Sequence, residues 1–189
     1  MGRDRQAELL LGEWACLGIL DQGPTHGFAI AARLKPTGDV GRVWSLSRPL
    51  TYRSLDQLVA RELVHAIGEE RGIAGGNRTI LAATPIGRAR LRTWLSTPVP
   101  HLRDLRSELL LKLVLAEQCG VDVGALLDGQ REVVESISSA LVDAADDVVT
   151  LWRRESSEAA RRFVDAVRSS RVAPGPGDAD GPGLPRVRP

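Results

Sequence analysis

Residues 47–85 read SRPLTYRSLDQLVARELVHAIGEERGIAGGNRTILAATP and contain the most informative pattern in the chain. The first part of this stretch, residues 47–61, predicts a helix. Ser47 is suited to accept a hydrogen bond from an amide of the first turn, and Pro49 lies within that turn, where its missing N–H costs little. The buried stripe of this helix is expected to consist of three apolar residues spaced i, i+3 and i+4, namely Leu55, Leu58 and Val59.

The second part of the stretch predicts a hairpin. Residues 63–67 and 79–83 are short apolar segments typical of strands, and residues 69–77 between them contain three glycines, as a flexible hairpin tip does. Residues 84–96 then predict a helix that begins with a threonine N-cap followed by a proline at the first helical position.

Two more helices are expected before this stretch. Residues 6–20 have apolar side chains near a 3.6-residue period and are followed by the helix-stopping sequence DQGP. Residues 25–34 predict a second helix, with Thr25 as its N-cap. Three helices followed by a two-stranded hairpin and a fourth helix are the ordered parts of a winged helix-turn-helix domain, which we place at residues 7–97.

The remainder of the chain predicts a separate helical domain. The sequence TPVP at 97–100 marks the boundary, and residues 101–170 are expected to form an antiparallel helical dimerisation domain, which makes the protein mostly α-helical. Residues 171–189 are rich in Pro and Gly and are expected to be disordered. The helices expected between them span about 104–118, 122–154 and 156–169, and a break within the long middle helix is left open.

The charge of the chain is divided unevenly. The net charge is only +1, which by itself does not indicate a nucleic-acid-binding protein. Residues 1–100, however, carry 13 Lys and Arg against 9 Asp and Glu, whereas residues 101–170 carry 9 against 13. A basic first half followed by an acidic second half favours nucleic-acid contact in the first half.

Composition excludes several classes of protein. Two cysteines, Cys16 and Cys119, and three scattered histidines are too few for a disulfide framework or a Cys-rich zinc site, so we expect no metal and no cofactor. No apolar run reaches the roughly 18 residues that a membrane span needs, and the polar start lacks a signal-peptide layout. We therefore expect a cytoplasmic, nucleoid-associated protein. We expect no catalytic residues either, because no nucleophile–base spacing appears and the Gly-rich segment precedes no helix, so it is not a phosphate-binding loop.

The DNA contacts expected from these elements lie on two helices and the hairpin. The first turns of helix 47–61 are the part that enters a major groove, and Arg48 is the strongest candidate for a base contact because a guanidinium pairs bidentately with guanine. The N-terminus of helix 25–34 and the hairpin tip are suited to phosphates. The predicted DNA-binding residues are Thr25, His26, Ser47, Arg48, Thr51, Tyr52, Arg53, Arg71, Asn77 and Arg78.

Several of these residues also have an alternative interpretation. Ser47 and His26 could serve only to start their helices, and the ring of Tyr52 could lie in the core. Arg53 could be an ordinary solvated helix residue. Cys16 lies in an apolar helix stripe and is expected to be a small core residue.

Several motifs, taken in order, resemble the PadR family of transcriptional regulators. After the helix end LGIL at 17–20, GPTHGFAI at 23–30 is similar to the family's GPxHGYxI motif. The stretch at 51–58, TYRSLDQL, is similar to its recognition helix, LYRxLxxL. The segments TPIGR at 84–88, WL at 94–95 and RSELLLKL at 106–113 continue the resemblance, which covers about residues 9–150.

The resemblance implies a homodimeric repressor whose winged domains bind a two-fold operator in double-stranded DNA and whose C-terminal helices form the dimer. It also implies a small aromatic or hydrophobic effector, for which Trp14 and Trp94 are candidate contacts, with plain core packing as the alternative. Two departures stand out. Phe28 replaces the usual Tyr, and Arg48-Pro49-Leu50 replaces a sequence such as Pro-Gly-Thr. A winged protein-interaction module without DNA binding is the alternative function.

Overall fold

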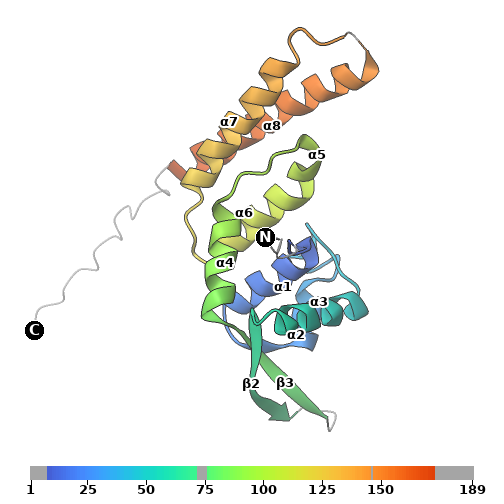
Figure 1. Ribbon diagram of the computed structural model, residues 1–189, viewed down its shortest axis with the longest axis vertical. Coiled ribbons are helices and arrows are strands. Elements are labelled where there is room, and N and C mark those ends of the chain that lie inside the picture. Colours follow the sequence, from blue (N-terminus) through green and yellow to red (C-terminus); the bar gives the residue numbers. More distant parts are fainter. Residues whose placement is uncertain (1–7, 72–75, 146, 173–189) are drawn as a thin grey trace, which may run out of the picture.

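The protein is built from helices and one small antiparallel sheet, and the computed structural model describes residues 8–71, 76–145 and 147–172. The fold is mostly α-helical, as predicted (Figure 1). In chain order the elements are α1 (Leu11–Asp21), β1 (Thr25–His26), α2 (Gly27–Arg33), α3 (Arg48–Ala60), β2 (Val64–Arg71), β3 (Asn77–Ala83), α4 (Pro85–Ser96), α5 (Leu102–Asp104), α6 (Leu110–Gln118), α7 (Gly124–Ala140) and α8 (Val148–Val172).

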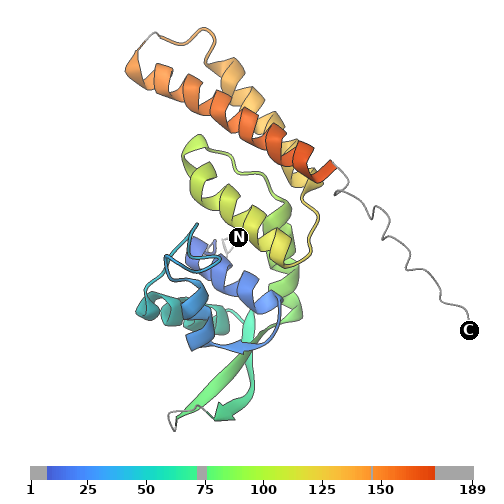
Figure 2. The same cartoon turned by 180° about the vertical axis from the view of Figure 1, so that it is seen from behind.

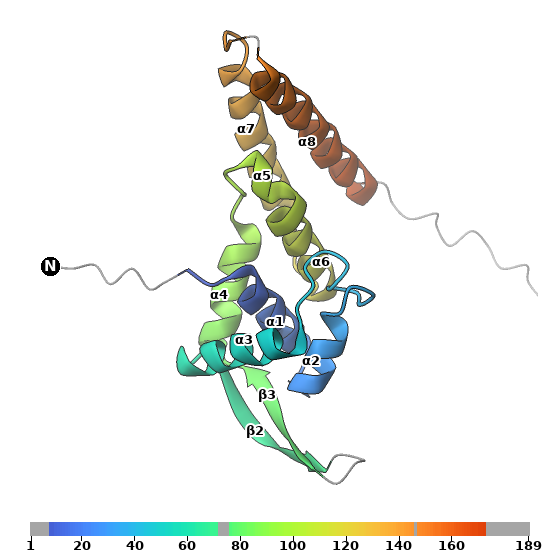
Figure 3. The same ribbon diagram turned by 90° about the vertical axis from the view of Figure 1, so that its right-hand side faces the viewer.

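The first half has the predicted winged helix-turn-helix arrangement. Helices α1, α2 and α3 pack together, and the β2–β3 hairpin projects from them as a wing (Figures 1 and 3). The sheet has the order β1-β3-β2. The two-residue strand β1 was not predicted. It pairs with β3 through Thr25 opposite Leu81 and His26 opposite Ile80, and so ties the start of α2 to the wing.

The start of α2 differs from the prediction. Thr25 is not the N-cap, because it belongs to β1, where its backbone pairs with the wing. His26 is the N-cap instead, and its Nδ1 accepts a hydrogen bond of 3.1 Å from the amide of Ala29. The first helix also begins later than predicted, at Leu11, and residues 6–7 lie outside the described residues.

Helix α3 follows its prediction closely, with one exception. Ser47 caps it and Pro49 lies in its first turn. Leu55 and Leu58 are buried, but Val59 is 44% exposed, so its assignment to the core is wrong. Val59 sits one residue beyond Leu58, and the rotation of about 100° per residue carries it from the buried face toward the wing side.

The wing strands are longer than the predicted 63–67 and 79–83. Cross-strand pairs extend from Val64 opposite Ala83 to Arg71 opposite Asn77, with one irregularity between Ala66 and Gly68. Backbone pairing continues beyond the apolar segments into polar residues, which a search for apolar segments does not identify as strand. Residues 72–75 of the predicted glycine tip at 69–77 lie outside the described residues.

The base of the wing is locked to α4 by the sequence TPIG at 84–87. Thr84 caps α4, since its hydroxyl accepts a 3.0 Å hydrogen bond from the amide of Gly87 and donates a 2.9 Å bond to the carbonyl of Glu62. The Thr84 amide donates to the Leu63 carbonyl at 3.0 Å. Glu62 adopts a left-handed backbone conformation, with φ of 58°, at the turn between α3 and β2.

The second half begins with a nearly continuous helix and ends with a hairpin of two long helices. Between α5 and α6, residues Leu105–Leu109 form a wider π-helical turn. The predicted boundary between residues 154 and 156 is wrong, because α8 runs through it from Val148 to Val172. The break that the sequence left open within 122–154 is present, since α7 ends at Ala140. Asp147 starts α8 by accepting a 2.8 Å hydrogen bond from the amide of Thr150, and Arg154 reaches back to the carbonyls of Leu141 and Ala144.

The wing and the far turn of the α7–α8 hairpin lie at opposite ends of the molecule (Figures 1 and 2). Of the described helices, none combines the length and apolar character that a membrane span requires. The predicted disorder of the tail concerns residues that, beyond 172, lie outside the described part of the chain.

One hydrophobic core runs from α1 into α6. The indole rings of Trp14 and Trp94 stack with their centroids 4.7 Å apart and an interplanar angle of 9°. Lys112 of α6 lies 4.9 Å from the Trp94 ring centroid, and its buried ammonium donates to the Thr97 carbonyl at 2.6 Å. Burial lowers the pKa of Lys112, while its ion pair with Glu108, at 2.8 Å, opposes that effect.

Helix α7 also holds the segment at 97–100 in place, through two hydrogen bonds. The side-chain amide of Gln130, which is fully buried, accepts from the amide of Val99 at 2.7 Å and donates to its carbonyl at 2.9 Å. A buried amide with both of its groups paired in this way holds the backbone in one register. The junction between the two halves is therefore an ordered connection.

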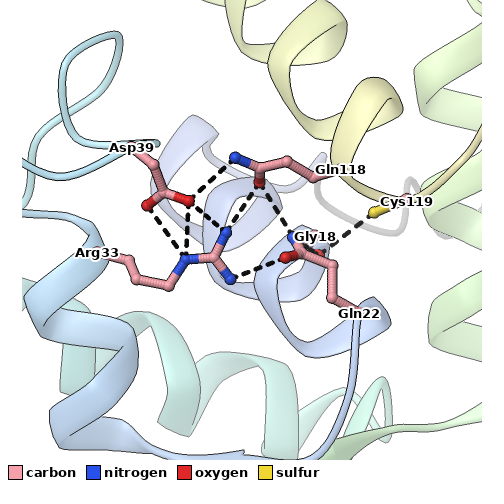
Figure 4. Close-up of polar contacts among 6 residues, drawn as sticks. All are labelled: Gly18, Gln22, Arg33, Asp39, Gln118 and Cys119. Carbon is pink, nitrogen blue, oxygen red and sulfur yellow. Dashed lines mark hydrogen bonds and ion pairs between the residues drawn. The ribbon is translucent and has the colours of Figure 1, made fainter. Parts of the chain in front are cut away.

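A polar cluster joins α2 to the end of α6 (Figure 4). The guanidinium of Arg33 donates to Asp39 at 2.6 Å, to Gln22 at 2.9 Å and to Gln118 at 2.9 Å. Gln118 in turn donates to Asp39 at 3.0 Å and accepts from Gln22 at 3.1 Å. The hydrogen bond from Arg33 lowers the pKa of the Asp39 carboxyl. This cluster links the helix-turn-helix to the C-terminal half.

Neither cysteine has the environment of a reactive thiol. Cys16 is fully buried in α1, as predicted, and burial raises the pKa of its thiol. Cys119 lies beside the polar cluster, with its sulfur 3.5 Å from the Gly18 carbonyl (Figure 4). Burial, followed by the Asp21 carboxylate, raises the pKa of Cys119 to about 11. Both thiols are therefore protonated near neutral pH, whereas the thiolate is the nucleophilic form.

Candidate nucleic-acid interface

A groove of about 700 Å³ lies between helix α3, the start of α2 and the wing strand β3. It brings basic and apolar side chains together on the winged half. Five of the predicted DNA-binding residues line it: His26, Arg48, Tyr52, Asn77 and Arg78. Its other lining residues are Gly27, Phe28, Leu55, Asp56, Val59, Gly76, Thr79 and Leu81.

Apolar side chains contribute much of the groove wall. Phe28 is 48% exposed and Val59 is 44% exposed, although both are large hydrophobic residues. Solvent-exposed apolar groups inside a groove rimmed by polar residues are typical of a binding surface. On DNA, such groups are able to contact thymine methyl groups.

Two arginines converge on the ring of Phe28. Arg48, the first residue of α3, has its guanidinium carbon 5.5 Å from the Phe28 centroid and 5.7 Å from the Tyr52 centroid. Arg78, from β3, has its guanidinium carbon 5.5 Å from the Phe28 centroid. These distances lie within the range of cation–π attraction. Tyr52 is 39% exposed, so its ring contributes to the groove rather than to the core.

Carboxylates do not neutralise these two guanidiniums. Within the described part of the chain, no carboxylate forms an ion pair with Arg48 or Arg78. Other arginines of the winged half are neutralised, since Arg33 pairs with Asp39 and Arg88 pairs with Asp21 at 2.9 Å. The groove therefore contains two guanidiniums that no ion pair of the described residues offsets, together with one carboxylate, that of Asp56.

His26 adds a further donor beside Arg78. Because its Nδ1 accepts the helix-capping bond from Ala29, the ring proton lies on Nε2. Nε2 is 3.3 Å from Nη1 of Arg78, which is also a donor. Two donors do not bond to each other, but both are able to bond to one acceptor oxygen between them.

The wing itself is electrically balanced. Its strands place Glu70 opposite Arg78 and Arg71 opposite Asn77. The amide of Asn77 donates to the Glu69 carboxylate at 2.7 Å, so one of its two donor hydrogens is already used. The wing therefore adds less to electrostatic attraction than the arginine at the start of α3.

Thr51 does not belong to the interface. It is fully buried, and its hydroxyl donates to the Ser47 carbonyl at 3.1 Å, so the prediction that it contacts DNA is wrong. The reason is that Thr51 lies one turn after Ser47 on the face of α3 that carries Leu55 and Leu58. Ser47 serves as the N-cap, with its hydroxyl 3.5 Å from the Leu50 amide.

Three other predicted residues lie outside the groove. Thr25 is half-buried in β1, Arg53 is exposed on α3, and Arg71 is exposed at the end of β2. Sequence reasoning missed Phe28 and Asp56 as groove residues. The sequence did mark Phe28, but only as the residue that replaces the usual Tyr of the motif at 23–30.

Trp14 and Trp94, the predicted effector contacts, are almost fully buried, at 4% and 7% exposure. Each ring covers a face of the other, and the ammonium of Lys112 lies over Trp94. An aromatic effector at this position would have to displace one of these contacts. The arrangement is that of core packing, which was the alternative interpretation.

No family model and no curated protein matches the chain. Fifteen chains of solved structures do match it. The crystal structure of Bacillus subtilis PadR in complex with operator DNA covers 84% of this chain and 97% of that chain, with 16% sequence identity and a TM-score of 0.44. The crystal structure of Bacillus subtilis PadR alone covers 88% and 96%, with 18% identity and a TM-score of 0.41. Both carry the name of the family that the sequence motifs resemble.

Proposed function

We propose that the protein is a DNA-binding transcriptional regulator that contacts duplex DNA through the groove between α2, α3 and the wing. The observation that carries this proposal is the convergence of two guanidiniums, Arg48 and Arg78, at the exposed start of a helix in a winged helix-turn-helix. Neither guanidinium pairs with a carboxylate of the described residues. A helix of this kind fits the major groove of B-DNA, which is about 12 Å wide.

Under this proposal, some of these side chains contact bases and others contact phosphates. Arg48 is the first residue of α3, and under this proposal its guanidinium pairs with guanine O6 and N7. His26 and Arg78 present two donors to a shared acceptor and are suited to one phosphate oxygen. Contacts to phosphate fix the position of the protein on DNA, whereas the contact of Arg48 discriminates the sequence.

Replacing Arg48 by alanine is expected to weaken binding to the preferred site by about 1–3 kcal/mol, with a much smaller loss on random duplex. The physical reason is that only the preferred site offers guanine at this position. The site is first selected from a random duplex pool with the full-length protein. Affinities for that site and for random duplex are then measured by fluorescence anisotropy at fixed salt.

The matched control for this test is Arg103→Ala. Arg103 is exposed on α5, on the side of the molecule away from the wing, so its loss removes the same charge without touching the groove (Figure 1). We expect it to leave both affinities unchanged. An equal loss on all sequences for Arg48→Ala would make Arg48 a phosphate contact instead. If the unmodified protein prefers no site over random duplex, DNA recognition itself is refuted, and the protein-interaction module becomes the better hypothesis.

We further propose that the protein acts as a homodimer through its C-terminal helices. Helix α8 carries an exposed apolar strip whose members are four, seven and four residues apart, close to whole numbers of helical turns, so that they share one side of the helix. Trp152 in this strip is 58% exposed and Val148 is 79% exposed, which is unusual for such large apolar groups. The strip consists of Val148, Trp152, Ala159 and Phe163.

Replacing Trp152 by glutamate is expected to convert the dimer into a monomer, because it places a charge in the middle of the apolar strip. Light scattering after size-exclusion chromatography gives the molar mass directly. Arg153→Glu is the control, since Arg153 is the exposed neighbour outside the strip. A dimer that survives Trp152→Glu would place the contact elsewhere.

Under this proposal, residues 7–97 bind DNA, residues 101–170 pair two copies, and the dimer represses transcription from a two-fold operator in the cytoplasm. Release by a small hydrophobic effector stays a prediction. Tryptophan fluorescence during titration with a panel of aromatic compounds tests it.

A further inference from the structure

We infer that Phe28 is a positioning residue that determines sequence specificity by holding Arg48 and Arg78 in place before DNA arrives. The inference rests on the proposed DNA binding and concerns how the same groove selects its sequence. Phe28 would make no hydrogen bond to a base. It would act through the two guanidiniums, whose central carbons lie 5.5 Å from its ring centroid.

The position of the Phe28 ring is set by close packing of α2 on α3. Gly27, the preceding residue, is buried, and a Cβ added to it would lie 2.9 Å from Cε1 of Tyr52. The backbone of α2 therefore approaches the Tyr52 ring as closely as glycine permits. His26 fixes the same turn by capping α2, and its β1 pairing ties it to the wing. Phe28 is therefore held in a fixed position between α3, which carries Arg48, and β3, which carries Arg78.

Arg48 needs such a partner because its own helix disfavours its charge. It is the first residue of α3, and the N-terminus of a helix carries a partial positive charge that repels a cation. Arg78 brings a second positive charge to the same ring. Within the described residues no carboxylate pairs with either guanidinium. The faces of Phe28 and Tyr52 supply the attraction that keeps Arg48 over the groove.

The consequence is a preorganised contact. A guanidinium already oriented by an aromatic face loses less side-chain freedom when it pairs with guanine. Without the Phe28 ring, the positive helix N-terminus and Arg78 would repel the Arg48 guanidinium from this position. Binding to DNA would then have to order the Arg48 side chain. Contacts to phosphate tolerate that mobility better than a bidentate contact to one base does.

The test compares Phe28→Leu with Phe28→Tyr in the full-length protein. Leucine keeps an apolar side chain but removes the aromatic face, whereas tyrosine keeps the face. Binding is measured by fluorescence anisotropy on the selected site and on random duplex at one salt concentration. We expect Phe28→Leu to lower the ratio of the two affinities by about twofold to fivefold, the range of a solvent-exposed cation–π contact. Phe28→Tyr should keep a ratio close to that of the parent.

Two further measurements separate positioning from structural damage. Phe28 is 48% exposed, so thermal unfolding of Phe28→Leu should change little. In the Arg48→Ala background, Phe28→Leu should have almost no effect on the ratio, because the arginine proposed to contact a base is absent. Arg78, which Phe28 also holds, is proposed to contact phosphate and therefore affects both affinities alike. An unchanged ratio in Phe28→Leu, in a protein whose parent does select a site, overturns this inference alone. A parent protein that selects no site overturns the proposed function as well.

Discussion

Replacing Gly87 by alanine is expected to cost at least about 3 kcal/mol of stability, the upper end of the range for overpacked sites. Gly87 lies in the first turn of α4, where a Cβ would meet the Leu63 carbonyl oxygen at 2.2 Å and Cδ1 of Leu17 at 3.3 Å. The obstructing oxygen belongs to the backbone and already accepts the Thr84 amide. Helix propensity favours alanine over glycine by only about 1 kcal/mol. The steric clash of the added Cβ with the Leu63 carbonyl oxygen is larger, so the net change is destabilising.

Urea unfolding at one protein concentration measures this loss. The matched control is Gly68→Ala, because Gly68 lies on β2 of the same wing and an added Cβ there meets nothing within 4 Å. The control should change the unfolding free energy by less than about 1 kcal/mol. If Gly87→Ala unfolds at the same urea concentration as the parent, α4 does not approach the wing base as closely as described.

Replacing Trp94 by alanine is expected to lower the unfolding free energy by about 3–5 kcal/mol. The change removes a ring that is 7% exposed, leaves Trp14 without its stacking partner and takes the aromatic face away from the Lys112 ammonium. The cavity would open where α1, α4 and α6 meet. Burying a lysine ammonium is unfavourable unless it has favourable partners. Losing the Trp94 ring, which is one partner of Lys112, therefore adds to the destabilisation caused by the cavity.

Trp94→Phe is the graded control for this prediction. Phenylalanine retains an aromatic face against Trp14 and should lose less than half as much stability as alanine. In a Trp14→Ala background, Trp94→Ala should cost less than it does alone, because the stack is already gone. Equal and additive losses would mean that the two rings contribute by burial only.

Local sequence rules predicted most of the winged half. The caps at Ser47 and Thr84 and the two strands were confirmed, because hydrogen bonds between near neighbours control them. The errors concern residues whose role depends on distant parts of the chain. Thr25 is a strand residue because β3 pairs with it, and Thr51 is buried because its face of α3 turns to the core.

The junction of α7 and α8 shows the same limit. The predicted boundary between residues 154 and 156 falls inside α8. The chain after the end of α7 at Ala140 is instead held by Arg154, which donates to the carbonyls of Leu141 and Ala144. The groove was also only half predicted. Sequence pointed to Arg48 and Arg78 as separate contacts, but their shared partner Phe28 was counted only as a departure from a family motif.

The order of the elements, most of the helix caps and the charge division between a basic first half and an acidic second half are all encoded locally. They follow from the spacing of apolar residues and from hydrogen bonds that span a few residues. Long-range packing, by contrast, determines which arginines form ion pairs, which threonine is buried and which aromatic ring contacts two guanidiniums. Such properties depend on groups far apart in the chain coming within a few ångströms, and no local pattern encodes those distances.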